Sequence, residues 1–309
     1  MRNAFIDTVL DSCGRRDDIF IVSGDAGLGV FDDFRKTYPS KFLNLGIAEQ
    51  NASSFSAGLS LTGHKVYLYN IIPFVLYRCY EQVRNDICYQ KANVVLVGIG
   101  SGVTYAPQGM THYSAEDLGL ARTLPNLKVL SPIDPVEARS AALYSLETEG
   151  PVYVRLAKRG EPRIHKKESV DVTSPLLIQE GEKIAVIFHG SIGTEVIKAR
   201  QILDGRGISP KLISLPMVQP IDIDKLFAML KGVDDVVSVE EHYVNTGLGS
   251  ILSVEHSKRR PAWNLHSLGI QYKFIHEIKD TDGMRELFGI SGRKIAEYLE
   301  DLGKRKRGG

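Results

Sequence analysis

The sequence predicts an α/β protein built from two consecutive parallel-sheet domains. The chain has 309 residues, more than a typical single domain contains. Short apolar runs alternate with helix-like segments, which is typical of parallel sheets covered by helices on both faces. After Pro162 the alternation stops, and residues 165–169 are polar. We therefore predict a first domain at 1–162, a linker at 163–180 and a second domain at 181–309.

Each predicted element follows from its local pattern. Apolar runs predict strands in the first domain at 19–22, 41–44, 66–69, 94–97, 127–130 and 152–155, and helical periodicity predicts helices at 47–62, 73–89 and 134–148. The same signals predict strands in the second domain at 184–188, 211–215, 236–239 and 263–268, and helices near 193–205 and 222–231 and from 247 onward.

Composition argues against several classes of protein. The net charge is +1, and the basic run at 304–307 has no interleaved aromatic residues, so we expect a solvated terminus and no nucleic-acid partner. No segment has the length and apolar character of a membrane span, and residues 1–7 lack a signal-peptide core. Cys13, Cys79 and Cys88 have no metal-type spacing and suit a reducing compartment. We expect a cytoplasmic protein without a membrane partner.

Glu49 is the first candidate for chemistry. It lies in Leu45-Gly46-Ile47-Ala48-Glu49-Gln50-Asn51, which follows a short apolar strand and opens a predicted helix. Exposed N–H groups in the first turn of a helix stabilise a carboxylate. An acidic residue there is often only a helix-start charge, so the position alone leaves both interpretations open.

Four blocks together resemble a known family. They are Asp25, Gly46-Ile47-Ala48-Glu49-Gln50-Asn51, Phe74-x-x-Tyr77-x-x-Tyr80 and Gly109-Met110-Thr111-His112. Their order and spacing resemble the pyrimidine-binding domain of thiamine-diphosphate enzymes. Within that group the sequence is most similar to transketolase and its relative 1-deoxyxylulose-5-phosphate synthase. The similarity runs from about residue 4 to the end of the chain.

The resemblance implies roles at the cofactor. Glu49 would hydrogen-bond N1′ of the aminopyrimidine and so help to activate thiamine diphosphate, which supplies the carbanion chemistry. Phe74, Tyr77 and Tyr80 would form the pocket for the aminopyrimidine ring, although an aromatic stripe at helical spacing is also typical of a core. Asp25 would lie near the cofactor and a subunit interface, although an aspartate there can also cap a turn.

The resemblance also implies residues that face the substrate. His112 would hydrogen-bond substrate oxygens or exchange protons with them. Gln108 occupies a position where sugar-phosphate transketolases commonly carry an acid, and Gly100 one where some carry a histidine. These two departures argue against the usual pentose-phosphate substrates. Lys158 and Arg159 follow the last strand of the first domain, where they could bind an anionic group or simply be solvated.

The mark of the diphosphate-binding domain is missing from this sequence. That mark is Gly-Asp-Gly followed by an asparagine some 25–30 residues later in the family. Gly24-Asp25-Ala26 lies too early and lacks the downstream asparagine. We therefore expect no metal ligands on this chain and Mg²⁺ ligands on a separate N-terminal subunit, in an α2β2 heterotetramer. We interpret His189 and Glu240-Glu241-His242 as structural or interface residues.

The interpretation that follows is the C-terminal subunit of a split transketolase. It would transfer a two-carbon ketol unit from a ketose or ketose phosphate to an aldose. The alternatives are a beta subunit of a 2-oxo-acid dehydrogenase, an enzyme like 1-deoxyxylulose-5-phosphate synthase, and a non-catalytic assembly subunit. Thr111-His112-x-x-x-Glu116-Asp117 with Pro125-Asn126 favours transketolase over the dehydrogenase.

Overall fold

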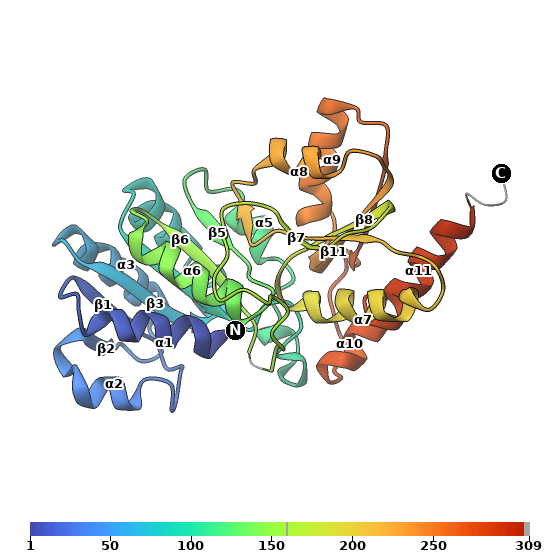
Figure 1. Cartoon of the computed structure of the whole chain (residues 1–309). Coiled ribbons are helices and arrows are strands. Elements are labelled where there is room, and N and C mark those ends of the chain that lie inside the picture. The colour runs from blue at the N-terminus through green and yellow to red at the C-terminus, as the bar shows by residue number, and fades with distance from the viewer. Residues whose placement is uncertain (159, 306–309) are drawn as a thin grey trace.

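The computed structural model describes residues 1–158 and 160–305. Arg159 and residues 306–309 lie outside this range, and with them part of the basic run predicted to be solvated. Two α/β units lie side by side, and the blue-to-green half of the chain forms the first of them (Figure 1). The predicted fold class is confirmed, because both units are built on mostly parallel sheets.

The first sheet has seven strands in the order β10-β5-β6-β4-β3-β1-β2. All its neighbours are parallel except β10 and β5. Its strands are β1 (Ile19–Ser23), β2 (Phe42–Asn44), β3 (Lys65–Ile71), β4 (Val94–Ile99), β5 (Lys128–Leu130), β6 (Val152–Leu156) and β10 (Met217–Gln219). Its helices are α1 (Arg2–Cys13), α2 (Asp32–Thr37), α3 (Glu49–Leu61), α4 (Tyr80–Gln82), α5 (Asp117–Ala121) and α6 (Pro135–Glu147).

Both faces of this sheet are buried, which explains the near-continuous apolar strands. Residues such as Ile21 and Tyr67 join a core cluster with α1 and α6. The adjacent residues Val22 and Leu68 point to the other face and join a cluster with α3 and α5. This alternation follows from the two-residue period of a strand.

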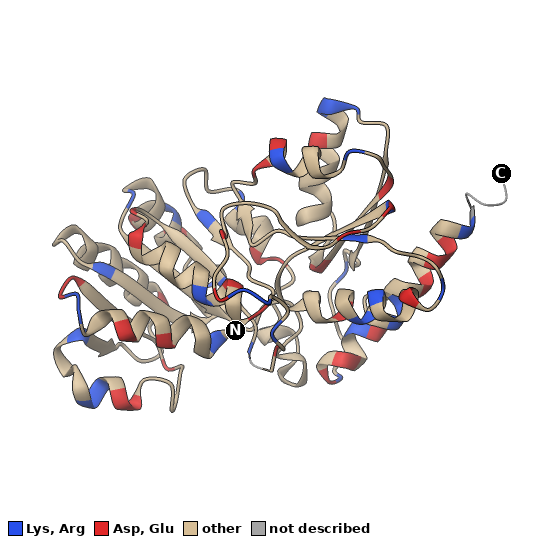
Figure 2. Ribbon diagram, in the orientation of Figure 1, with Lys and Arg blue, Asp and Glu red and all other residues tan. Residues whose placement is uncertain are grey.

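The second sheet has five strands in the order β12-β11-β8-β9-β7, and only the edge strand β7 is antiparallel. Its strands are β7 (Leu176–Gln179), β8 (Lys183–Phe188), β9 (Lys211–Ser214), β11 (Val233–Tyr243) and β12 (Asn264–Ile270). Helices α7 (Gly193–Asp204) and α11 (Gly292–Arg305) cover one face, whereas α8 (Ile223–Met229) and α9 (Leu248–Arg259) cover the other. The remaining helix is α10 (Thr281–Leu287). Positive and negative residues are interspersed along α11 (Figure 2).

Two short strands depart from the predicted segments. Residues 176–179 fall in the predicted linker but form β7, and residues 217–219 fall in the predicted second domain but extend the first sheet as β10. Each is an edge strand of three or four residues whose partner is remote in sequence or antiparallel. Such pairing leaves little periodic signal in the sequence.

The predicted helix at 73–89 is present only in an altered form. Residues Pro73–Tyr77 and Val83–Tyr89 are π-helical, and the three-residue α4 lies between them. A π-helical turn is wider than an α-helical one, so residues three apart no longer lie one above the other. The Phe74 and Tyr77 side chains consequently reach different neighbours.

Candidate active site

Glu49 is held at the start of α3, as the sequence predicted. The chain leaves β2, turns at Gly46 with a φ of +70° and enters the helix, while the Gly46 N–H donates to Asn44 Oδ1 at 2.8 Å. Glu49 is only 8% exposed. Its Oε1 accepts a hydrogen bond from Arg78 Nη1 at 3.0 Å. This ion pair fixes the direction of the carboxylate.

Arg78 links Glu49 to two other predicted residues. Its guanidinium carbon lies 4.5 Å from the centroid of the Phe74 ring. The His112 ring approaches Phe74 edge-on, with the ring centroids 5.6 Å apart. The chain therefore brings Glu49, Phe74 and His112 into one group from three distant segments. Arg78 was not among the residues predicted from the sequence, although its position four residues after Phe74 on a helical segment suggested a cation–aromatic pair.

Tyr77 and Tyr80 make different contacts from Phe74. The Tyr77 hydroxyl donates to Glu116 Oε2 at 3.2 Å and accepts from the Glu116 N–H at 3.4 Å. Burial, and then the charges of Asp117 and Glu116, raise the pKa of Tyr77 well above its ordinary value. The Tyr80 hydroxyl hydrogen-bonds Thr123. Tyr77 thus connects the π-helical segment to α5, and the hydroxyl of Tyr80 bonds outside the Glu49–Phe74–His112 group.

Asp25 lies exposed on the loop after β1, beside the turn that leads to Glu49. The Ser23 hydroxyl donates to the Ala26 carbonyl at 2.9 Å, and the Ser23 carbonyl accepts from the Leu45 N–H at 2.9 Å. Two large apolar side chains are exposed on these loops: Leu28, three residues after Asp25, at 96%, and Ile47, two residues before Glu49, at 76%. Asp25 therefore belongs to an open, partly apolar edge.

His112 lies on a loop that the second domain supports. The loop turns at Gly109, and His112 Nδ1 is 2.9 Å from the Thr111 hydroxyl. Tyr113 is buried in a cluster that includes residues of β11, β12 and α10, and its hydroxyl donates to the Glu277 carbonyl at 3.0 Å. Gln108 is exposed one residue before Gly109. The position of His112 thus depends on contacts between the domains.

Tyr105 brings the predicted substrate-facing residues together. The Lys158 ammonium lies 4.6 Å from the centroid of the Tyr105 ring, and the centroids of the Tyr105 and His112 rings are 6.1 Å apart. Arg159, predicted with Lys158 as a possible anion ligand, lies outside the described residues. Tyr105 was not predicted as a site residue, because nothing local in the sequence pairs it with His112 and Lys158, which lie 7 and 53 positions away.

A buried ion pair seals the first sheet at the carboxyl end of β6. Arg155 in β6 donates through Nε to Asp117 Oδ2 at 2.7 Å, and Tyr153 donates to the same oxygen at 2.7 Å. Arg155 Nη2 also reaches the Glu241 carbonyl in the second domain at 3.0 Å. Both charged side chains are almost fully buried. This pair joins α5, β6 and β11.

His189, Glu240, Glu241 and His242, interpreted from the sequence as structural or interface residues, all lie buried around this ion pair. His189 Nδ1 is 2.9 Å from the Ser131 hydroxyl, and burial lowers the pKa of His189 to about 3. Glu240 accepts the N–H groups of the first turn of α9, Glu241 pairs with Arg285, and His242 Nε2 accepts the Leu118 N–H at 3.1 Å. Within residues 1–158 and 160–305, no three His, Cys, Asp or Glu side chains are arranged to hold a metal ion.

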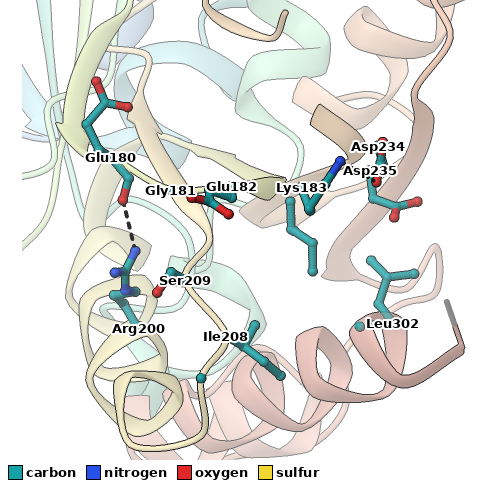
Figure 3. Close-up of a pocket in the computed structure, with 13 residues that line it drawn as sticks. Glu180, Gly181, Glu182, Lys183, Arg200, Ile208, Ser209, Asp234, Asp235 and Leu302 are labelled. Carbon is teal, nitrogen blue, oxygen red and sulfur yellow. Dashed lines mark hydrogen bonds and ion pairs between the residues drawn. The ribbon is translucent and has the colours of Figure 1, made fainter. Parts of the chain in front are cut away.

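A cavity of about 880 Å³ lies in the second domain, away from these residues (Figure 3). Its walls include Glu180, Lys183, Arg200, Asp234 and Leu302. Arg200 donates to the Glu180 carbonyl at 3.1 Å and pairs with Asp204, while Lys183 pairs with Asp234. Arg200 and Lys183 are thus each engaged in an ion pair, and none of the predicted site residues lines this cavity.

Comparison with protein families identifies the fold. Residues 1–162 match the family described as transketolase, pyrimidine binding domain, and residues 175–270 match transketolase, C-terminal domain. The chain therefore belongs to the transketolase family, whose members are thiamine-dependent transferases. No helix among the described residues is long and apolar enough to cross a membrane.

Individual relatives place the chain more closely within the family. It is 33% identical over 283 residues to one subunit of the apulose-4-phosphate transketolase of Actinobacillus succinogenes, with 91% of each chain covered. It is 35% identical to the 1-deoxy-D-xylulose-5-phosphate synthase of Caldanaerobacter subterraneus, over 89% of this chain but 44% of that protein. A solved split gene transketolase, described as an inactive beta4 tetramer, matches with a TM-score of 0.85, 27% identity and coverage of 97% and 96%.

The residues of this chain fit one end of thiamine diphosphate. A buried carboxylate can share a proton with a ring nitrogen, and the half-buried Phe74 ring offers an apolar face to a heteroaromatic ring. Glu49 and Phe74 supply both features within one contact group. The donor set therefore suits the aminopyrimidine end of the cofactor.

Proposed function

We propose that this chain is the C-terminal subunit of a two-component, thiamine-diphosphate-dependent transketolase. The complex would transfer a two-carbon ketol unit from a ketose or ketose phosphate to an aldose acceptor. The observation that carries this proposal is the grouping of Glu49, Phe74 and His112 through Arg78. The long match to a relative whose name describes it as a single subunit of a transketolase supports the two-component form.

In this proposal each residue of the group has one task. Thiamine diphosphate supplies the carbanion chemistry when it is bound. Glu49 shares a proton with N1′ of the aminopyrimidine. Phe74 contributes an aromatic wall of the pocket for that ring, and Tyr77 and Tyr80 follow it three and six residues later in the sequence. Asp25 flanks the cofactor at the open edge. His112 hydrogen-bonds substrate oxygens and exchanges protons with them.

Gln108 and Lys158 are the proposed substrate ligands besides His112. Gln108 is exposed four residues before His112, and its amide can both donate and accept a hydrogen bond. An amide does not reproduce the preference of an acid for a donor hydroxyl. We therefore expect weak activity on xylulose 5-phosphate and better activity on a modified sugar or sugar phosphate.

The partner would be an N-terminal subunit that carries Gly-Asp-Gly and the Mg²⁺ ligands, in an α2β2 heterotetramer. The exposed Leu28 and Ile47 support this, because a partner that covered these large apolar side chains would remove apolar surface from water. They flank Asp25 and Glu49 in the sequence, so a partner covering them would also enclose the cofactor. Cys13, Cys79 and Cys88 are buried free thiols, which suits a cytoplasmic complex.

Reconstitution tests the proposal. The purified chain alone is expected to bind thiamine diphosphate weakly by calorimetry and to turn over no ketose. The chain co-purified with the subunit that carries Gly-Asp-Gly is expected to bind cofactor with Mg²⁺ and to transfer ketol units across a panel of ketoses and aldoses. Micromolar cofactor affinity without a partner would contradict the two-component form.

A second candidate is a synthase-type reaction. The 35% identity to 1-deoxy-D-xylulose-5-phosphate synthase supports it. The same reconstituted complex separates the two functions: carbon dioxide released from pyruvate in the presence of glyceraldehyde 3-phosphate indicates the synthase, whereas ketol transfer between sugars indicates a transketolase.

A further inference from the structure

Gly100, which directly follows β4, leaves a space that the Tyr105 ring fills. Its φ is +95°, in the left-handed region that favours glycine, and a Cβ added there would overlap the Tyr105 ring. Its N–H donates to the Leu156 carbonyl at 2.8 Å, which ties it to the end of β6. Glycine at this position is therefore required both by the backbone and by the ring of Tyr105.

The Tyr105 ring is fixed in this space from several sides. The ring packs against the core cluster that includes α1 and α6. The backbone carbonyl of Tyr105 accepts the Gln108 N–H at 2.9 Å. Burial raises the pKa of the Tyr105 phenol. A fixed aromatic ring can hold a cation at its face, and here the Lys158 ammonium lies 4.6 Å from the ring centroid.

Lys158 lines a cavity of about 420 Å³ between the two domains. Three cationic side chains line this cavity together with three carboxylates: Glu161 is paired with the N-terminal ammonium, Asp280 accepts the Gly283 N–H, and Asp282 lies 4.0 Å from Arg285. Lys198 pairs with Glu195 at 2.7 Å, and Arg285 pairs with Glu241. Among the described residues, no carboxylate forms an ion pair with Lys158, which has only the Tyr105 face as a partner. Its charge is therefore available to an anion.

We propose that Tyr105 is a positioning residue that sets substrate specificity, because its ring contacts the His112 ring and also holds the Lys158 ammonium, which would bind an anionic group at the far end of the sugar. The proposal rests on the proposed function. Gly100 contributes no side chain here, so the charged group that meets the Tyr105 ring is the Lys158 ammonium. A phosphate monoester and a sulfonate share the required tetrahedral oxyanion.

Three variants of the reconstituted enzyme test this. Tyr105→Leu removes the aromatic face, Tyr105→Phe keeps it, and Lys158→Gln removes the charge. We expect Tyr105→Leu to raise KM for a phosphorylated donor about tenfold with kcat unchanged, and to leave KM for the unphosphorylated donor as it was. Tyr105→Phe should restore the original KM. In the Lys158→Gln background, Tyr105→Leu should add no further effect.

A binding measurement on the full chain alone is independent of turnover. Phosphorus NMR line broadening of methyl phosphate reports weak binding, and competition by methanesulfonate shows which oxyanion the site prefers. Broadening that is lost in Lys158→Gln and weakened in Tyr105→Leu supports the proposal, whatever the reconstituted wild-type complex does. A reconstituted wild-type complex that transfers no ketol unit would count against the proposed function alone.

Clear outcomes overturn the proposal. Equal KM changes for phosphorylated and unphosphorylated donors in Tyr105→Leu would show a merely structural role. Additive effects of the two substitutions would show that Tyr105 does not act through Lys158. If Tyr105→Leu fails to fold, Lys158→Gln decides, because an unchanged KM for the phosphorylated donor and unchanged broadening of methyl phosphate exclude an anion at Lys158.

Discussion

The carboxyl edge of the first sheet is used in two different ways along its length. At the ends of β5 and β6, the second domain covers the edge with a buried network centred on Asp117 and Arg155. At the ends of β1 and β2, the edge stays open, with Asp25, Leu28 and Ile47 exposed. Ligands of open parallel sheets bind at this edge. The sealed half serves stability, and the open half is available for chemistry.

Glu49→Gln tests the open half with the largest expected effect. The amide keeps the shape of the side chain but cannot share a proton in the same way. In the reconstituted complex we expect the rate of ketol transfer to fall about 10²–10⁴-fold. Hydrogen–deuterium exchange at C2 of the cofactor should slow in parallel, while the melting temperature of the chain stays near that of the wild type. A near-normal exchange rate would remove Glu49 from this role.

Asp117→Asn tests the sealed half. The substitution leaves the Arg155 guanidinium buried without a carboxylate, and breaking a buried pair in this way typically costs about 3–5 kcal/mol of the free energy of unfolding. Urea denaturation of the full chain measures it. The control is Asp33→Asn, which removes the exposed pair with Lys36 and should leave the midpoint unchanged. Equal midpoints of urea unfolding for Asp117→Asn and Asp33→Asn would contradict the stabilising role of the sealed half.

Phe74→Leu sharpens the assignment of the open half. It removes the ring that contacts Arg78 and His112. We expect the thiamine diphosphate concentration for half-maximal activity to rise by up to about tenfold, with little change in stability. The matched control is Phe227→Leu in the second domain, where Arg259 also lies over an aromatic ring, at 5.1 Å. A similar rise in the control would show that the effect is not local to the candidate site.

His165→Gln gives the smallest effect and probes the predicted linker between the two domains. Burial lowers the pKa of His165, but the hydrogen bond and charge of Glu137, 2.8 Å away, outweigh it and raise that pKa above its usual 6.5. Glu137 also accepts from Ser214 in the second domain. A raised folded-state pKa gives stability that is complete below the unfolded pKa of 6.5 and is lost as the pH rises through the folded-state pKa.

Melting temperatures between about pH 6 and pH 8 check this prediction. The wild type should lose stability across that window, and His165→Gln should show a flatter profile. His276→Gln, which changes an exposed histidine, serves as the control and should follow the wild type. A wild-type slope that persists in His165→Gln would assign the pH dependence to another group.

The sequence predicted the sheets better than it predicted the contacts within the site. Buried parallel strands such as β4 and β8 are continuous apolar runs, so local composition identifies them. The short β7 and β10 carry no such signal, and the amphipathic pattern at 73–89 does not distinguish an α-helix from π-helical turns. The pairing of Arg78 with Glu49 and the contact of Tyr105 with Lys158 join residues remote in the sequence, so neither could be predicted from local pattern.

The strand β10 has a consequence for how this chain can be divided. Although residues 217–219 follow several elements of the second unit, they pair with β5 at the end of the first sheet, and the Gln219 amide donates to the Leu124 and Leu127 carbonyls at 3.0 and 2.8 Å. A chain cut at the linker would uncover β5 and leave its ladder groups unpaired. An uncovered edge strand recruits other chains. The first unit is therefore expected to aggregate when expressed alone, and the two units to unfold in a single cooperative transition.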